Sequence, residues 1–285
     1  MSGELQLACA ARRDYLAHCA AMLASVIANH EGPVSAHLLV GEDVEEGELE
    51  ALGAMMTAAG GRLTPVPVGA EALERLAVSD SLPLSHWYWV LLPHLLPGLD
   101  RVLYLDCDLI ALDSPAPLGQ LDLGGRPLGA VTNVFPDSAT GAAYVTAIGV
   151  KEPRLYFNSG VLALDLDEMR RRDLSRKILE HGRHHPDRGF LYEQDAANAV
   201  LAGDWAPMHP RWNLMLGARR FPWAGELFGP GELEAARADP GILHFEGGGA
   251  NKPWHPDADP GDRETYLRYR ERTPWPRLGE GPAGS

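Results

Sequence analysis

The chain has 285 residues, 45% of them hydrophobic and 22% charged, which is ordinary for a globular protein that can bury a large core. Its net charge of −14 argues against a nucleic-acid-binding protein, which needs a basic surface, and the lack of any run of about 18 apolar residues predicts no membrane span. The three cysteines, Cys9, Cys19 and Cys107, form no C-x-x-C pair, so we expect reduced thiols and a cytoplasmic location.

The first half of the chain alternates between expected strands and expected helices. The strands are residues 5–10, 37–40, 63–66 and 102–105, and the helices are residues 15–29, 45–59 and 85–96. Asp14 and Asp43 are the expected N-caps of the first two helices, and Pro93 marks a kink or turn in the third. This alternation predicts an α/β fold with a parallel, right-handed wound sheet.

The second half continues this pattern less regularly. Strands are expected at 128–131, 160–164 and 242–244, helices at 166–182 and 193–201, and irregular chain at 203–223. No repeat or linker divides the sequence, so we expect one domain over residues 1–273, with halves of about 1–130 and 131–273. The Pro/Gly-rich segment 274–285 is an expected flexible tail.

Two carboxylates follow the buried strand at 102–105, at the sheet edge where α/β proteins bind ligands. Asp106 and Asp108 are two residues apart, so on extended chain their side chains converge, while Cys107 points into the sheet as a small hydrophobe. Without a cation the two carboxylates would repel, and one would take up a proton. This run therefore indicates a clamp for a divalent ion, although acidic residues also follow strands because loops are wet.

Four motifs follow one another along the chain. They are Asp106-Cys-Asp108, Tyr156-Phe-Asn-Ser-Gly-Val161, Tyr192-Glu-Gln-Asp195 and His244-Phe-Glu-Gly-Gly-Gly-Ala-Asn-Lys-Pro-Trp254. With these motifs the sequence resembles the family 8 glycosyltransferases, the retaining group that includes bacterial galactosyltransferases and glycogenin, over about residues 5–254. The resemblance implies a GT-A fold, in which a Rossmann-like, mostly parallel sheet carries helices on both faces and a small C-terminal acceptor or lid region.

The resemblance also implies a donor and a metal ion. The donor is a nucleoside diphosphate sugar, usually UDP-linked, and the ion is Mn²⁺, with Mg²⁺ as the alternative, held by Asp106, Asp108 and His244. Such ligands suit Mn²⁺ and leave positions open for diphosphate oxygens. The glycines at 247–249 let the backbone approach phosphate, and Lys252 neutralises the leaving diphosphate. We expect Asp108→Ala to abolish metal dependence while stability without metal holds or rises, because carboxylate repulsion is relieved.

The remaining site residues are assigned by the same correspondence. Asn158, Gln194 and Asp195 are the catalytic candidates around the transferred sugar; the alternatives are a turn residue for Asn158 and a charge at a helix N-terminus for Asp195. Gln194 stands near the β-face of the anomeric carbon, and because an amide is a poor nucleophile we favour front-side transfer assisted by the departing phosphate. The implied donor-binding residues are Ala10, Arg12, Asp14, Tyr15, Trp89, Asp106, Cys107, Asn133, Gly247 and Lys252.

Three departures from the family pattern concern the donor. The family's Asp-x-Asn-Tyr is replaced by Arg12-Arg13-Asp14-Tyr15, and an Arg cannot accept from a uracil imide. Trp89 stands where the family has an Arg that reaches the donor, and the His…Lys-Pro-Trp segment is about two residues longer. Asn133 also replaces a common Asp. We therefore hypothesise a non-standard donor or donor pose.

Two other functions stay open at this point. One is a non-catalytic nucleotide-sugar-binding protein on the same fold, which the altered nucleoside motif favours. The other is a haloacid-dehalogenase-like phosphatase, whose later Gly-Asp-x-x-x-Asp is incomplete at Gly203-Asp204 and Gly261-Asp262. The acceptor of a transferase would be a small molecule, a glycan or a peptide, and homo-oligomerisation is undecided.

Overall fold

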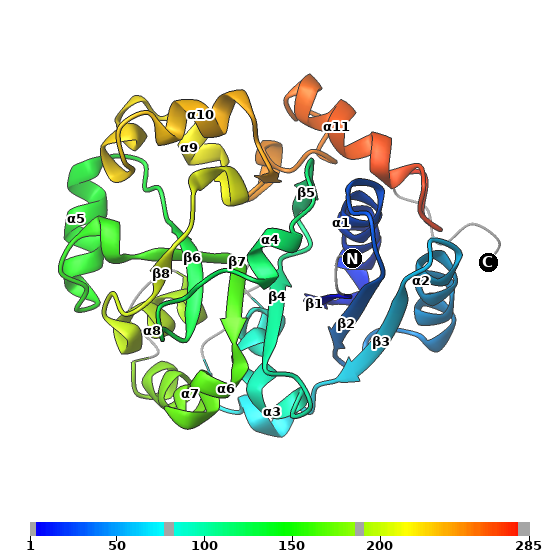
Figure 1. Cartoon of the computed structure of the whole chain (residues 1–285), viewed down its shortest axis with the longest axis horizontal. Coiled ribbons are helices and arrows are strands. Elements are labelled where there is room, and N and C mark those ends of the chain that lie inside the picture. Colours follow the sequence, from blue (N-terminus) through cyan, green and yellow to red (C-terminus); the bar gives the residue numbers. More distant parts are fainter. Residues whose placement is uncertain (1–3, 77–82, 186–190, 279–285) are drawn as a thin grey trace.

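A seven-stranded sheet with the strand order β3-β2-β1-β4-β7-β6-β8 forms the centre of the fold (Figure 1). The computed structural model describes residues 4–76, 83–185 and 191–278. In the order of the sheet, the strands are β3 (Arg62–Pro67), β2 (Val34–Val40), β1 (Leu5–Ala11), β4 (Arg101–Leu105), β7 (Phe157–Asp165), β6 (Leu128–Thr132) and β8 (Ala206–Pro207). Only β7 runs against its neighbours, so the sheet is mostly parallel, as predicted.

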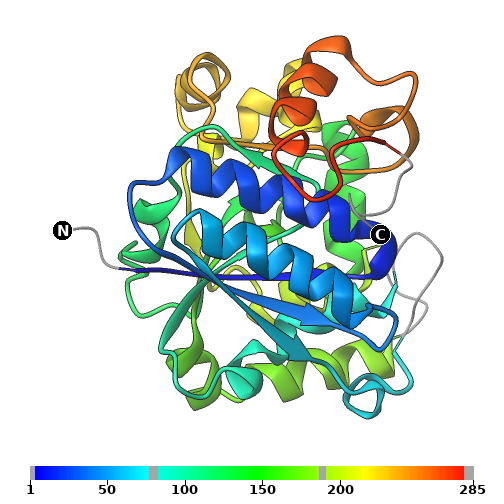
Figure 2. The same ribbon diagram turned by 90° about the vertical axis from the view of Figure 1, so that its right-hand side faces the viewer.

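Helices cover both faces of this sheet, as the alternation of elements predicted (Figures 1 and 2). One face packs against α1 (Leu16–Asn29) and α2 (Glu46–Ala58), and α11 (Pro260–Arg270) packs against α1. The other packs against the 3-10 helix Leu84–Leu91, α3 (Leu92–Leu95), α6 (Leu166–Arg171), α7 (Leu174–His184) and α8 (Tyr192–Leu201). Side chains alternate across a strand, so Leu7 and Cys9 of β1 enter the first layer and Ala8 the second.

A second, three-stranded sheet stands beside the carboxyl end of β4. It has the order β5-β10-β9, with β5 at Leu109–Ala111, β10 at Ile242–His244 and β9 at Leu214–Met215. His244 pairs with Leu109, and the backbone N–H of Phe245 donates to the carbonyl of Asp108 at 3.0 Å. This ladder brings the end of β10 against the residues that follow β4, although more than a hundred residues separate them in the chain.

The remaining α-helices are short. They are α4 (Ala116–Gly119), α5 (Ser138–Ala147), α9 (Leu216–Arg220) and α10 (Glu232–Ala238). Among the residues that the structure describes, no helix is both long enough and apolar enough to cross a bilayer.

Several local predictions are wrong. Asp14 caps no helix and instead accepts from Arg12 Nε at 3.1 Å, while α2 begins after Glu45, whose N–H donates to Glu48, rather than after Asp43. The predicted helix 166–182 is two helices, broken at Asp173, whose φ is 55°.

The predicted helix at 85–96 and the predicted flexible tail at 274–285 also need correction. Residues 85–96 form mainly a 3-10 helix, and Pro93 lies in the first turn of α3, where its missing N–H costs nothing. The expected flexible tail is packed at its start: Trp275 is buried, and its carbonyl accepts from the Arg270 guanidinium. The last seven residues of that tail, 279–285, lie outside the described residues.

Candidate functional site

Asp106, Asp108 and His244 meet where β4 and β10 end. One ligand atom from each of the three lies within 4.8 Å of the other two, and His244 Nε2 is 3.4 Å from Asp108 Oδ1. His244 is buried, and the backbone N–H of Asp106 is fixed by the carbonyl of Gly160 at 2.9 Å. The structure thus brings together the three side chains that the motifs implied as metal ligands.

The two carboxylates of this cluster differ in their electrostatics. Burial and the neighbouring charge of Asp108 raise the pKa of Asp106, whose Oδ1 accepts from the Tyr104 hydroxyl at 2.9 Å. Burial also opposes ionisation of Asp108, but the Lys252 ammonium and the His244 imidazole hold the pKa of Asp108 well below its usual range. Asp108 is therefore a stable anion, whereas the negative charge of Asp106 is unfavourable unless a cation lies beside it.

Gly160 has no side chain, and the cluster occupies the space that a Cβ at this position would fill. A Cβ added at Gly160 would lie 2.4 Å from His244 Cε1 and 3.0 Å from Asp106 Oδ2. Any other residue would therefore push against one ligand of the cluster or the other. The glycine of the Tyr156–Val161 motif is thus explained by a close approach to the site, a role that the sequence analysis did not assign.

These donors fit a divalent ion such as Mn²⁺. Two carboxylates and one imidazole are ligands that Mn²⁺ accepts, and the raised pKa of Asp106 reflects burial and the charge of Asp108, both of which a cation would offset. When bound, such an ion would supply positive charge to a diphosphate. Asp106, Asp108 and His244 are the residues that would hold it.

A cleft of about 500 Å³ opens at the cluster, a volume suited to a small ligand. Of the residues expected to bind metal or donor or to take part in catalysis, eleven line it: Ala10, Arg12, Tyr15, Asp106, Cys107, Asp108, Asn158, Gln194, His244, Gly247 and Lys252. Cys107 also donates its thiol to the carbonyl of Ala10 at 3.0 Å, so it packs inward as expected. The carboxyl ends of β1, β4 and β10 and the start of the antiparallel strand β7 all contribute residues to the lining of this cleft.

Four of the expected residues lie outside the cleft lining. Trp89 is 1% exposed and packs near Tyr104 beneath the sheet, so it does not replace the expected Arg at the surface of the cleft. Asn133 is buried behind Asn158, from which it accepts a hydrogen bond at 3.2 Å. Asp14 lies on the surface, paired with Arg12.

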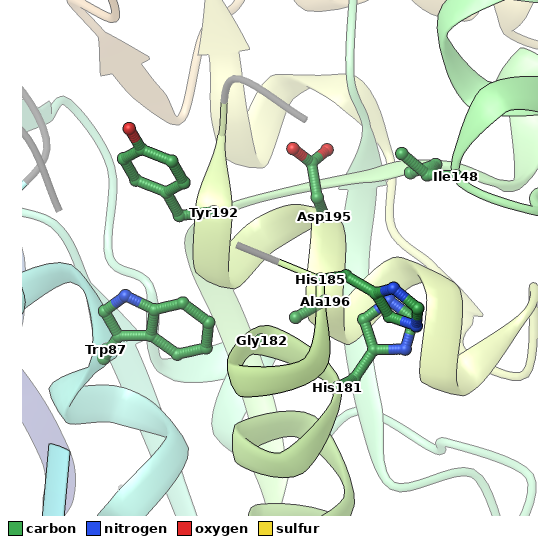
Figure 3. A pocket seen from close by; sticks show the side chains of 8 residues that line it. All are labelled: Trp87, Ile148, His181, Gly182, His185, Tyr192, Asp195 and Ala196. Atoms are coloured by element: carbon green, nitrogen blue, oxygen red, sulfur yellow. The ribbon is translucent and has the colours of Figure 1, made fainter. Parts of the chain in front are cut away.

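Asp195 is the fourth of these residues and faces a separate small cavity between α7 and α8 (Figure 3). Its oxygens accept from the hydroxyls of Tyr144 and Tyr156, both at 2.6 Å, and from the N–H of Leu191. Burial raises the pKa of Asp195. With its acceptor positions used in this way, Asp195 orients Tyr156, whose hydroxyl accepts from Gln194 Nε2 at 3.0 Å.

Sequence reasoning missed Glu193, which lines the cleft beside Gln194. Glu193 is 4% exposed; its Oε1 accepts from Ser159 Oγ at 3.2 Å and lies 4.0 Å from His86, while its Oε2 has no partner among the described residues. Burial and the nearby Asp106 raise the pKa of Glu193 well above its ordinary value. A buried carboxyl group with one free oxygen at a cleft is suited to form a hydrogen bond with a polar ligand.

Sequence reasoning also missed Asn213, which is fully buried behind His244. Its carboxamide oxygen lies 2.9 Å from His244 Nδ1 and its nitrogen 2.9 Å from Asn158 Oδ1. The signal in the sequence was the Arg211-Trp-Asn213 segment, which resembles a family stretch before the C-terminal region but assigns no role to Asn213.

Comparison with known proteins places the chain in a family. The family described as Glycosyl transferase family 8 matches residues 6–258. General stress protein A of Bacillus subtilis (strain 168) is 30% identical over 220 residues, which span 74% of this chain and 73% of that protein. Probable galacturonosyltransferase-like 3 of Arabidopsis thaliana is 32% identical over 193 residues, which span 63% of this chain but only 52% of that protein.

A solved structure agrees over almost the whole chain. The galactosyltransferase LgtC, crystallised with donor and acceptor sugar analogs, superposes with a TM-score of 0.84 at 25% identity, covering 99% of this chain and 98% of LgtC. The family match leaves no support for the phosphatase alternative, which belongs to a different fold family. The chain belongs to glycosyltransferase family 8 and is a transferase with the GT-A fold.

Proposed function

We propose that this protein is a metal-dependent, retaining glycosyltransferase that transfers a hexose from a nucleoside diphosphate sugar to a hydroxyl of an acceptor. The observation that carries the proposal is the convergence of Asp106, Asp108 and His244 at one end of a 500 Å³ cleft, with Lys252 beside them. A divalent ion and an ammonium at one point of a cleft suit the two negative charges of a diphosphate leaving group.

The transferred sugar would occupy the part of the cleft between the metal cluster and α8. Gln194, Asn158 and Glu193 line that part, and they offer amide and carboxylate groups for sugar hydroxyls. Both ends of the Gln194 amide are engaged: Oε1 accepts from the N–H of Ser159 at 2.8 Å, and Nε2 donates to Tyr156. A fixed neutral amide is suited to support charge near the anomeric carbon rather than to attack it, which supports front-side transfer.

The nucleoside would lie toward Arg12 and Tyr15, at the carboxyl end of β1. Arg12 lines the cleft while its Nε donates to Asp14, so a guanidinium stands where the family has a carboxylate. An Arg can stack on a base or bind phosphate, but it cannot accept from an imide N–H. We infer a donor whose base or pose differs from that of the usual UDP-sugars.

A donor panel tests this function. Thermal unfolding is measured with Mn²⁺ and UDP-, GDP-, ADP- and CDP-sugars, and the donors that stabilise the protein are incubated with acceptor mixtures and analysed by mass spectrometry. Mn²⁺-dependent transfer with retained anomeric configuration is the expected result, and Asp106→Asn should abolish it. Binding without transfer or donor hydrolysis would favour the non-catalytic alternative, whereas preferred turnover of UDP-glucose or UDP-galactose would contradict the non-standard donor.

A further inference from the structure

Lys252, which is proposed to neutralise a diphosphate, is instead buried against a carboxylate of the protein itself. It is 8% exposed, its ammonium is in close contact with Asp108 Oδ2, and it donates to the carbonyl of Phe245 at 2.8 Å. The other oxygen of Asp108 lies 3.4 Å from His244 Nε2. Both oxygens of a proposed metal ligand are therefore engaged by groups of the chain itself.

A divalent ion at this cluster would compete with that arrangement. The ion would need an oxygen of Asp108 and would bring two positive charges close to the ammonium of Lys252, which repels it. Without the ion, the ammonium neutralises Asp108 and limits the repulsion between Asp108 and Asp106. One ammonium thus stabilises the metal-free cluster and opposes the ion that would replace it.

We infer that Lys252 is an internal counter-ion that holds Asp108 in the metal-free protein and turns into the cleft when a divalent ion binds. The inference rests on the proposed function, because it assigns the same cluster to a metal. Once displaced, the ammonium is free to meet the diphosphate. The ion alone then binds weakly, because it must displace the ammonium from Asp108. The diphosphate binds the displaced ammonium, so the ion and the diphosphate each raise the affinity of the protein for the other.

The surroundings of Lys252 allow its side chain to move while its backbone stays in place. The preceding residue, Asn251, accepts from Arg220 at 2.8 Å, and Trp254 stacks on His18 with ring centroids 3.5 Å apart. Both contacts anchor the segment on either side of Lys252. The ammonium itself lines the cleft and uses two of its three protons in the contacts described above.

Calorimetric titration of metal-stripped full-length protein with Mn²⁺, without nucleotide, tests the inference. Lys252→Met should bind Mn²⁺ more tightly than the wild type by about tenfold or more, because a competing charge is gone. Lys252→Arg, which keeps the charge, should bind as weakly as the wild type, and Lys177→Met, on the exposed surface of α7, should change nothing. In a second titration with saturating UDP, GDP, ADP or CDP, the wild type should gain more Mn²⁺ affinity than Lys252→Met.

Thermal unfolding gives a readout that is independent of these titrations. Lys252→Met should unfold at a lower temperature than the wild type without metal, and Mn²⁺ should restore more of its stability. Should Lys252→Met not fold without metal, Lys252→Gln, which lacks the charge but can still donate to Asp108, carries the same expectation.

The outcomes separate this inference from the proposed function. Unchanged or weaker Mn²⁺ binding by Lys252→Met without nucleotide would overturn the counter-ion role, even if the wild type binds Mn²⁺ with a nucleotide. A wild type that binds no Mn²⁺ with any of UDP, GDP, ADP and CDP would overturn both the metal site and the counter-ion. Tighter binding by Lys252→Met but not by Lys252→Arg supports both.

Discussion

The Nδ1 atom of His244 lies 2.9 Å from the carboxamide oxygen of Asn213, and the orientation of that carboxamide is fixed by its other partner. Asn213 Nδ2 donates to Asn158 Oδ1, an oxygen that also accepts from the backbone N–H of Gly160 at 3.0 Å and is therefore an acceptor. When a cation is bound and the His244 ring is neutral, the ring would therefore keep its proton on Nδ1 and present the lone pair of Nε2 to the cation.

Asn213 is accordingly a positioning residue for a proposed metal ligand, and its loss should weaken metal binding. Asn213→Ala should lower Mn²⁺ affinity, measured by calorimetry with saturating nucleotide, by about 10- to 100-fold, as is usual when an outer partner of a ligating histidine is removed. Asn213→Asp keeps an acceptor for Nδ1 but sets an oxygen against Asn158 Oδ1, so it should lose affinity, though less than Asn213→Ala. Equal losses in both variants would show that packing, not the hydrogen bond, is what matters.

Some site residues could be predicted from a local sequence pattern or a family motif, whereas others depend on tertiary packing. Asp106 and Asp108 were predictable because they follow a buried strand at a spacing that converges their side chains. His244 and Lys252 were recognisable only through a family motif. Glu193 lies inside the Tyr192–Asp195 motif but received no role from it, and Asn213 received none either, because the roles of both residues depend on which polar atoms meet after packing.

The fold was predicted better at its centre than at its helix ends. Buried strands such as β4 are specified by continuous apolar runs, whereas caps depend on competing partners. Asp14 has the residue type of an N-cap but pairs with Arg12, and Asp43 accepts from the N–H of Arg13 at 2.8 Å. Asp195 likewise pairs with two tyrosines that lie far from it in sequence, and no local rule anticipates such contacts.

Gly160 offers a test of the cluster that needs no polar change. Gly160→Ala should reduce Mn²⁺ binding by at least about tenfold and lower stability by about 1–3 kcal/mol, because the new methyl group overlaps His244 and Asp106. Gly129→Ala is a matched control: its Cβ would lie 2.9 Å from Leu121 Cδ2, away from the cleft, so it should cost stability but not metal affinity. Calorimetry and denaturant unfolding of both variants measure the two effects separately.

Glu193 should give the stability of the protein a distinct pH dependence. Its pKa is raised in the folded state by burial and by Asp106, so its contribution to stability is full below the ordinary value of 4.5 and is lost as pH rises toward the folded pKa. Glu193→Gln cannot ionise, so its stability relative to the wild type should rise across that range. Denaturant unfolding between pH 4 and pH 8 measures this difference, and parallel curves for the two proteins would contradict a buried, uncompensated carboxyl group.

Glu193→Gln should also separate stability from function. Above the folded pKa of Glu193 its free Oε2 accepts, whereas the amide nitrogen that replaces it in Glu193→Gln only donates, so binding of a sugar hydroxyl there should weaken. We expect about a tenfold loss or more in kcat/KM for the donor, with Mn²⁺ affinity little changed. Assays with the donor identified by the panel, at fixed saturating Mn²⁺, measure this loss.

Replacement by asparagine should change the stability of the metal-free protein differently at Asp106 and at Asp108. The structure also reverses the expectation from sequence that stability without metal holds or rises when Asp108 is lost. Asp108→Asn removes the anion that neutralises buried Lys252, so it should lower stability without metal by about 3 kcal/mol, the cost of breaking a buried pair. Asp106→Asn removes a carboxyl whose pKa is already raised and keeps an acceptor for Tyr104, so its stability without metal should hold or rise. Both variants should lose Mn²⁺ binding. Denaturant unfolding at pH 8 in the presence of a chelator compares them, and equal stability of the two variants would mean that Lys252 does not depend on Asp108.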